Sequence, residues 1–290
     1  MNIKETECLG FRSLSIDNGI IRIDIVPEIG GRVMFFGYPD HNLLFTNSEL
    51  QGIKAVYEAK SPELLQEERL KQGLMLYGGE KIWLAPQEEW GHAPYVDMDH
   101  GEYSCEVKRE NDCTKIILTS PICRETQLQL TKTLTIQQGE AHVHFGFQLA
   151  NYGEKPISKG IWQVTQLNRP AEVRIAANHA NKLRYSSYYG NAAVSEEGAM
   201  IRNSVDHAER YKFGVSSDRG ELSVHMGAVQ LHQNMSVNDA TYPHGFMFEV
   251  FNSDRYPYFE AELHSPLLTI EPQSSAAFEI TWRLARGAVD

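Results

Sequence analysis

The sequence has 290 residues, of which 42% are apolar and 10% aromatic, and this content argues against an intrinsically disordered chain. Its 27 Lys and Arg against 38 Asp and Glu give a net charge of −11, which argues against a nucleic acid or an anionic membrane as partner. No apolar run approaches the roughly 20 residues of a membrane-spanning helix.

Processing signals and cysteine usage favour the cytoplasm. Residues 1–7 lack the hydrophobic segment of a signal peptide. The cysteines Cys8, Cys105, Cys113 and Cys123 show no CxxC pair and no metal-ligand spacing, so we expect reduced thiols in a reducing compartment. We therefore expect a cytoplasmic protein without a cofactor.

The first half of the chain contains one clear strand pattern and one clear helix pattern. Apolar and polar residues alternate over 21–25, directly after the turn signal Asn18-Gly19. Residues 61–73 predict a helix, because Ser61 can cap it, Pro62 suits its first position and Gly73 can end it. Leucines at positions 64, 65 and 70 form the expected apolar stripe.

The second half is dominated by alternation with a period of two. It covers 128–136, 143–149, 222–226, 246–250 and 278–284, with turn signals such as Gln138-Gly139 between the runs. Each run is typical of a strand with one buried and one polar face. The sequence therefore predicts one all-β domain over residues 1–290, an antiparallel sandwich or barrel with few short helices.

Three segments break the alternation, and functional sites are expected where local rules fail. In the first, 27–33, paired glycines precede Arg32, which is either an exposed residue of a tight turn or a hydrogen-bond donor in a groove. In the second, 77–92, two of the four tryptophans alternate with polar side chains. The candidate ligand contacts there are Tyr77, Lys81, Trp83 and Gln87. Aromatic faces among hydrogen-bonding groups suit a sugar.

The third segment, 256–266, contains an ionisable strand face formed by Glu260, Glu262 and His264. Three such groups on one face often perturb one another's pKa values, and a carboxylate there is a candidate general base. The alternative interpretation is a solvated strand face.

Weaker candidates lie on other strands. Trp162 and Thr165 belong to a polar-rich strand that lines either a groove or the core. His142 and His144 are two residues apart without a third ligand, so no metal site is expected.

Together these motifs resemble the galactose-mutarotase-like superfamily. The resemblance is carried by Asn18-Gly19, by 30–33, by 77–83 and by 258–263 followed by 268–272, and it covers nearly the whole chain. The pattern GGxKxWxAPQ at 78–87 is more similar to an uncharacterised bacterial branch, a domain of unknown function.

The resemblance implies a β-supersandwich of two large antiparallel sheets with a sugar groove. In mutarotases a Glu is the general base on the anomeric hydroxyl and a His is the general acid on the ring oxygen. Glu262 matches the base. The histidines have no match, since Tyr77 stands at one of their positions and the strand of Trp162 carries none. His92, Tyr77 or Lys81 would have to take the role of the acid.

Two hypotheses follow, with a third that has less support. The chain is a carbohydrate-binding protein of the aldose-epimerase type that acts on the anomeric centre of a sugar or sugar acid, with Glu262 as base and His92 as the readiest acid. Alternatively it is a non-catalytic sugar-binding domain that has lost the mutarotase histidines. A lyase acting on an acidic polysaccharide is the third. The oligomeric state stays open, with a homodimer as one alternative.

Overall fold

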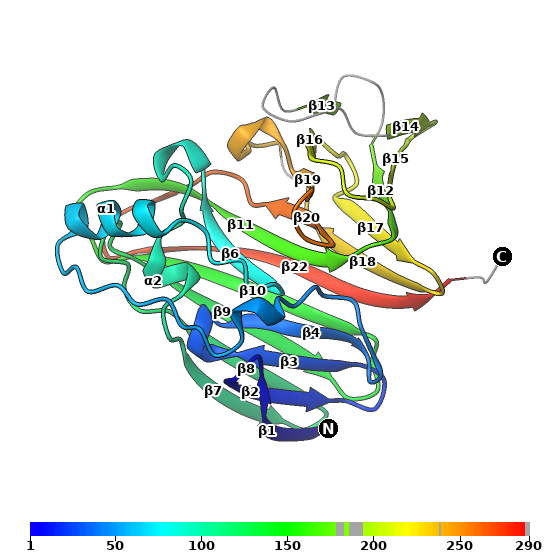
Figure 1. The fold of residues 1–290 in the computed structure, drawn as a ribbon, viewed down its shortest axis with the longest axis horizontal. Coiled ribbons are helices and arrows are strands. Elements are labelled where there is room, and N and C mark those ends of the chain that lie inside the picture. The colour runs from blue at the N-terminus through cyan, green and yellow to red at the C-terminus, as the bar shows by residue number, and fades with distance from the viewer. Residues whose placement is uncertain (178–182, 186–193, 238, 288–290) are drawn as a thin grey trace.

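Two antiparallel sheets face each other in the computed structural model, which describes residues 1–177, 183–185, 194–237 and 239–287 (Figure 1). The first sheet has twelve strands within these residues. Its main path runs β1 (Asn2–Cys8), β2 (Phe11–Asp17), β3 (Arg22–Val26), β4 (Arg32–Tyr38), β6 (Glu80–Ala85), β11 (Ile157–Asn168), β20 (Tyr258–His264), β19 (Phe248–Asn252), β16 (Tyr211–Val215) and β13 (Leu183–Tyr185); β5 (His41–Asn42) pairs with β4, and β21 (Leu268–Ile270) pairs with β11.

The second sheet has ten strands in the same part of the chain. Their order is β14 (Val194–Glu197), β15 (Met200–Val205), β12 (Ala171–Ala176), β17 (Glu221–Met226), β18 (Val229–Met235), β22 (Ser275–Arg286), β10 (His142–Asn151), β9 (Leu128–Gln137), β8 (Cys113–Thr119) and β7 (Ser104–Glu110). The expectation of an all-β sandwich of large antiparallel sheets is thus confirmed.

The core lies between the sheets, as the alternation predicts. Along β9 and β10, buried and partly exposed residues alternate strictly. Phe36 of the first sheet packs edge-on against Trp282 of the second, with 5.1 Å between ring centroids. The strand faces that alternate in sequence therefore become the inner faces of the sandwich.

The predicted helix is α1 (Pro62–Gln72). The Ser61 hydroxyl accepts a hydrogen bond from the Leu64 N–H at 3.3 Å, and Gly73 ends the helix with a φ of 76°. Leu65 is buried but Leu64 is 57% exposed, so the apolar stripe is narrower than expected. The second helix, α2 (Val96–Asp99), lies beside β6 (Figure 1). No described helix is long and apolar enough to span a membrane.

A buried polar bridge joins the two sheets. Lys132 of β9 lies among the inward-facing leucines, and its Nζ donates to Glu80 Oε2 of β6 at 2.7 Å. Gln163 Nε2 of β11 donates to the other oxygen of Glu80 at 3.1 Å, and Trp282 Nε1 donates to Gln163 Oε1 at 3.2 Å. All four side chains are buried, so each polar group needs the partner that it has.

Candidate ligand-binding site

Five adjacent strands of the first sheet, β6, β11, β20, β19 and β16, place their outward-facing side chains in one area. Trp162 of β11 lies opposite Trp83 of β6 and opposite His264 of β20. Glu262 of β20 lies opposite Glu249 of β19. Residues that are far apart in sequence thus share one surface, because outward positions recur at every second residue.

An aromatic cavity of about 290 Å³ opens on this surface. The rings of Trp83 and Trp162 are 5.2 Å apart and nearly perpendicular, and Trp90 packs 5.5 Å from Trp83. The lining residues are Leu74, Leu76, Trp83, Gln87, Trp90, Trp162, Arg210, Lys212, Phe251, Ser253, Asp254, Arg255, Tyr256, Tyr258 and Glu260. Aromatic rings with a few convergent polar groups are typical of a small-molecule site.

Two lysines contact the rings of the tryptophan pair. Lys81 Nζ lies 4.0 Å from the centroid of Trp83, and Lys212 Nζ lies 4.7 Å from that of Trp162. Lys81 Nζ is 3.7 Å from a carboxylate oxygen of Glu260. Lys212 Nζ also lies 2.9 Å from a carboxylate oxygen of Glu262. Each ammonium therefore combines a cation–π contact with an ion pair.

A buried charge cluster, formed by Lys212, Glu249, Glu262, His244 and His264, underlies the cavity. Lys212 Nζ donates to Glu262 Oε2 at 2.9 Å and lies 3.3 Å from Glu249 Oε2. The same Glu249 oxygen accepts from His264 Nε2 at 2.8 Å and from His244 Nδ1 at 3.1 Å.

The two carboxyl groups of the cluster have pKa values that are shifted in opposite directions. Burial raises the pKa of Glu262 to about 7, with the charges of Glu249 and Glu260 adding to the effect and Lys212 opposing it. Burial also opposes ionisation of Glu249, but Lys212 and the two imidazoles outweigh it and hold that pKa well below its ordinary value. Burial disfavours the charged form of Lys212 too, yet both carboxylates raise its pKa, so the ammonium stays protonated.

The ligating atoms of His244, Glu249 and His264 lie within 4.8 Å of one another, which raises the question of a metal. The backbone N–H of Gln87 donates to His244 Nε2 at 3.0 Å, so that nitrogen is an acceptor and Nδ1 carries the proton toward Glu249. The Lys212 ammonium lies beside the same Glu249 oxygen. These contacts favour a hydrogen-bonded network over a metal centre.

Several residues singled out from the sequence reach the cavity. Trp83, Gln87 and Trp162 line it. Glu262 does not: it has no exposed surface, and its Oε2 accepts from Trp162 Nε1 at 2.8 Å beneath Lys212. Glu260 is the carboxylate of β20 that faces the cavity. The role of Glu262 as general base stays a prediction.

Three residues that were expected to contact the ligand, Arg32, Tyr77 and Lys81, do not line the cavity. Arg32 is fully buried, with its guanidinium 2.7 Å from Asp99, so it does not point into the groove. The Tyr77 hydroxyl donates to the Ile53 carbonyl, and Lys81 is only 1% exposed behind Glu260.

The predictions that Thr165 contacts the ligand and that His92 is the general acid are also wrong. Thr165 faces the second sheet and accepts from Gln233 Nε2 at 3.1 Å, because its position in β11 is an inward one. His92 is exposed, and its Nε2 donates to the Leu70 carbonyl of α1 at 2.8 Å. The readiest candidate for the general acid therefore lies outside the cavity and the charge cluster.

Three residues of the charge cluster, Lys212, His244 and Glu249, were not predicted from the sequence. Glu249 carried a signal, because apolar residues at 246, 248 and 250 place it on the opposite face of the strand. His244 stands singly in the sequence, without a pattern that marks it. Its approach to Glu249 depends on the short 3-10 helix Pro243–Gly245, where it adopts a φ of 56°.

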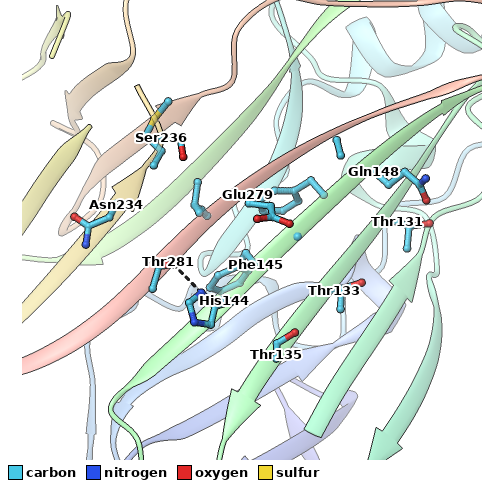
Figure 2. A pocket seen from close by; sticks show the side chains of 15 residues that line it. Thr131, Thr133, Thr135, His144, Phe145, Gln148, Asn234, Ser236, Glu279 and Thr281 are labelled. Atoms are coloured by element: carbon cyan, nitrogen blue, oxygen red, sulfur yellow. Dashed lines mark hydrogen bonds between the residues drawn. The ribbon is translucent and has the colours of Figure 1, made fainter. Parts of the chain in front are cut away.

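A larger hollow of about 580 Å³ lies on the outer face of the second sheet (Figure 2). Threonines 131, 133 and 135 of β9 border it together with Glu279 and His144. Phe145 and Phe147 contribute backbone and little else, since their rings are buried in the core. The exposed ring of this hollow is the His144 imidazole, whereas the cavity of the first sheet has the partly exposed rings of Phe251 and Tyr256, so that cavity is the stronger candidate.

Known protein structures with a similar fold include mutarotase-like proteins. No curated protein matches the sequence. A galactose mutarotase-like protein from Clostridium acetobutylicum is similar in structure, with a TM-score of 0.64, 10% identity and 99% of each chain covered. A galactose 1-epimerase from Lactobacillus acidophilus gives a TM-score of 0.60 at 11% identity, covering 99% of this chain and 98% of its own. At such identities the likeness shows the fold alone.

A third similar structure is longer. A TPR-domain-containing protein from Parabacteroides distasonis gives a TM-score of 0.66 at 12% identity. The match covers 97% of this chain, which spans only about half, 48%, of that protein. In sequence, residues 11–214 match a family described as a domain of unknown function, DUF4380. Because this match extends over more than half of its length, the chain, with its mutarotase-like sandwich fold, belongs to the DUF4380 family.

Proposed function

We propose that this protein binds a small carbohydrate in the aromatic cavity. The observation that carries the proposal is that the partly exposed rings of Phe251 and Tyr256, the Lys212 ammonium and the Glu260 carboxylate line one cavity together with Trp83 and Trp162. The C–H faces of a sugar pack on aromatic rings, while its hydroxyls bond to charged and polar groups. The likeness to a galactose mutarotase-like protein and a galactose 1-epimerase supports this ligand class.

Titration with a panel of hexoses and sugar acids, followed by calorimetry and tryptophan fluorescence, tests the proposal. Glu260→Gln keeps the volume of the cavity but removes a charged acceptor, so the affinity for a bound sugar should fall about tenfold. Glu279→Gln, in the hollow of the second sheet, is the matched control and should bind as the wild type does. Failure of every sugar to bind contradicts the proposal, and so does an equal loss in both variants.

A second candidate is proton transfer at the anomeric centre with Glu262 as general base. In that reaction the carboxylate takes the proton of the anomeric hydroxyl, the bond from C1 to the ring oxygen breaks as C1 becomes a carbonyl carbon, and the ring oxygen takes a proton from the Lys212 ammonium, which lines the cavity. Ring closure reverses both proton transfers. The favouring observation is that burial raises the pKa of Glu262 to about 7 while its Oε1 has no hydrogen-bond partner among the described residues. Lys212 has to move aside to open the path to this carboxylate. Exchange NMR on any sugar that binds separates catalysis from binding alone.

A further inference from the structure

We propose that the ligand is an acidic sugar, whose carboxylate or phosphate group binds at a cationic end of the aromatic cavity formed by Arg210, Lys212 and Arg255. This inference rests on the proposed function, because it names the class of ligand that the same cavity takes. All three side chains line the cavity.

The order of the strands places Arg210 and Arg255 away from the tryptophans. Register pairs Tyr211 of β16 with Asn252 of β19, so Arg210, one residue before β16, lies beside the β19–β20 connection that carries Arg255. The tryptophans come from β6, from the segment after it and from β11, on the far side of β20 and β19. A ligand that spans the cavity therefore meets the tryptophans at one end and the two arginines at the other, with Lys212, which contacts Trp162, between them.

The connection that carries Arg255 is held in place by side chains. The Ser253 hydroxyl accepts from the backbone N–H groups of Arg255 and Tyr256, at 3.2 and 3.1 Å. Arg169 donates to the carbonyls of Ser253 and Tyr256, at 2.8 and 2.9 Å. The Arg255 guanidinium lies 5.0 Å from the centroid of the Tyr256 ring. The backbone beneath this guanidinium is thus fixed before a ligand arrives, which lowers the entropic cost of binding.

The charges of the lining residues favour an anion. Three lining residues are cationic and two, Asp254 and Glu260, are acidic. Glu260 is already held, because Gln166 Nε2 donates to it at 2.8 Å and Lys81 lies behind it. Lys212 is already paired with Glu249 and Glu262, so Arg210 and Arg255 are the donors that we assign to the anionic group of the ligand. A guanidinium offers paired donors that match a carboxylate or a phosphate.

Calorimetric titration with four probes tests the inference: glucose, glucuronate, glucose 6-phosphate and inorganic phosphate. We expect glucuronate or glucose 6-phosphate to bind at least about tenfold more tightly than glucose, and this advantage to shrink at high salt. The acid that binds more tightly identifies the anionic group. Arg210→Gln and Arg255→Gln alter exposed residues and should each remove most of the advantage. Arg219→Gln, at an exposed position outside the cavity lining, should keep it.

The outcomes separate the two proposals. If glucose binds as tightly as both acids, or if neither arginine variant loses affinity for the acid, the inference is overturned while sugar binding stands. Inorganic phosphate that binds as tightly as glucose 6-phosphate also overturns the inference, because the site then takes an anion rather than a sugar. If no hexose or sugar acid binds, the proposed function itself fails.

Discussion

Glu260 and Glu262 lie two positions apart on one face of β20, yet their surroundings differ. Glu260 faces the aromatic cavity, whereas Glu262 is covered by Lys212 and Trp162. The sequence predicted the shared face, because the side-chain direction of a strand alternates locally. The sequence could not predict that Lys212 and Trp162 cover Glu262, because they lie 50 and 100 residues from it along the chain.

The raised pKa of Glu262 gives the protein a specific dependence of stability on pH. Between its ordinary value of 4.5 and about 7, the folded state holds a proton that the unfolded state has lost. The free energy of unfolding should therefore fall as pH rises through this window. Glu262→Gln removes the titrating group, so its stability should fall less than that of the wild type. Denaturant unfolding at several pH values between about 5 and 8 measures the difference.

Glu249→Gln is the contrasting variant. Lys212 and the imidazoles hold the pKa of Glu249 well below its ordinary value, against the effect of burial, so the group is ionised in both states at neutral pH. Its loss should lower stability, and the fall of stability with rising pH between about pH 5 and pH 8 should become shallower, because the Glu249 charge contributes to the raised pKa of Glu262. Parallel pH profiles for the wild type and Glu262→Gln would contradict the assignment of a raised pKa to Glu262.

Among the elements, α1 shows which features are local. Ser61, Pro62 and Gly73 mark its ends in the sequence and occupy those positions in the structure. The burial of Arg69 at 1% exposure was not predicted, because its partners come from other segments. Its Nη1 donates to the carbonyls of Trp90 and Ala93, and its Nε donates to Glu125 at 3.0 Å. This residue fixes α1 to the segment that supplies Trp90 to the cavity.

Replacing Arg69 with Met should destabilise the protein by about 2–5 kcal/mol, because two buried carbonyls and the Glu125 carboxylate lose their donor. Denaturant unfolding gives the change in the free energy of unfolding. Arg109→Met, at an exposed position of β7, is the matched control and should change stability by less than about 0.5 kcal/mol. Equal losses in the two variants would show that Arg69 does not anchor the helix.

For the molecule as a whole, the sequence predicted the sandwich but not the composition of the site. Strands such as β9 and β10 show their buried faces in their own alternation, and the family resemblance covered nearly the whole chain. The order β6-β11-β20-β19-β16 is set by pairing between distant segments, so it is not a local property. Lys212 joined the site through that order, and His244 joined it through the 3-10 helix that precedes β19. The family histidines have no counterpart at their expected positions, and their absence gave no hint of His244 and His264 beside Glu249.

The bridge between the sheets yields a prediction at this scale. Lys132→Met leaves the Glu80 carboxylate buried without its cation and should cost about 3–5 kcal/mol of stability. The double variant Lys132→Met/Glu80→Gln removes the unpaired charge and should recover much of that loss. Unfolding of both single variants and the double variant forms a thermodynamic cycle. A double variant that is no more stable than Lys132→Met would contradict an ionic origin of the loss.

The same bridge also bears on the fidelity of folding. A slip of β9 by one residue would turn Lys132 to solvent and bring a threonine, Thr131 or Thr133, between the sheets, which leaves Glu80 without a counter-charge. Two apolar sheet faces can pack against each other in several registers. The ion pair between Lys132 and Glu80 forms in one of these registers. Lys132 and Glu80 therefore act as a check on assembly, because a misaligned sandwich would carry a buried charge that the correct one neutralises.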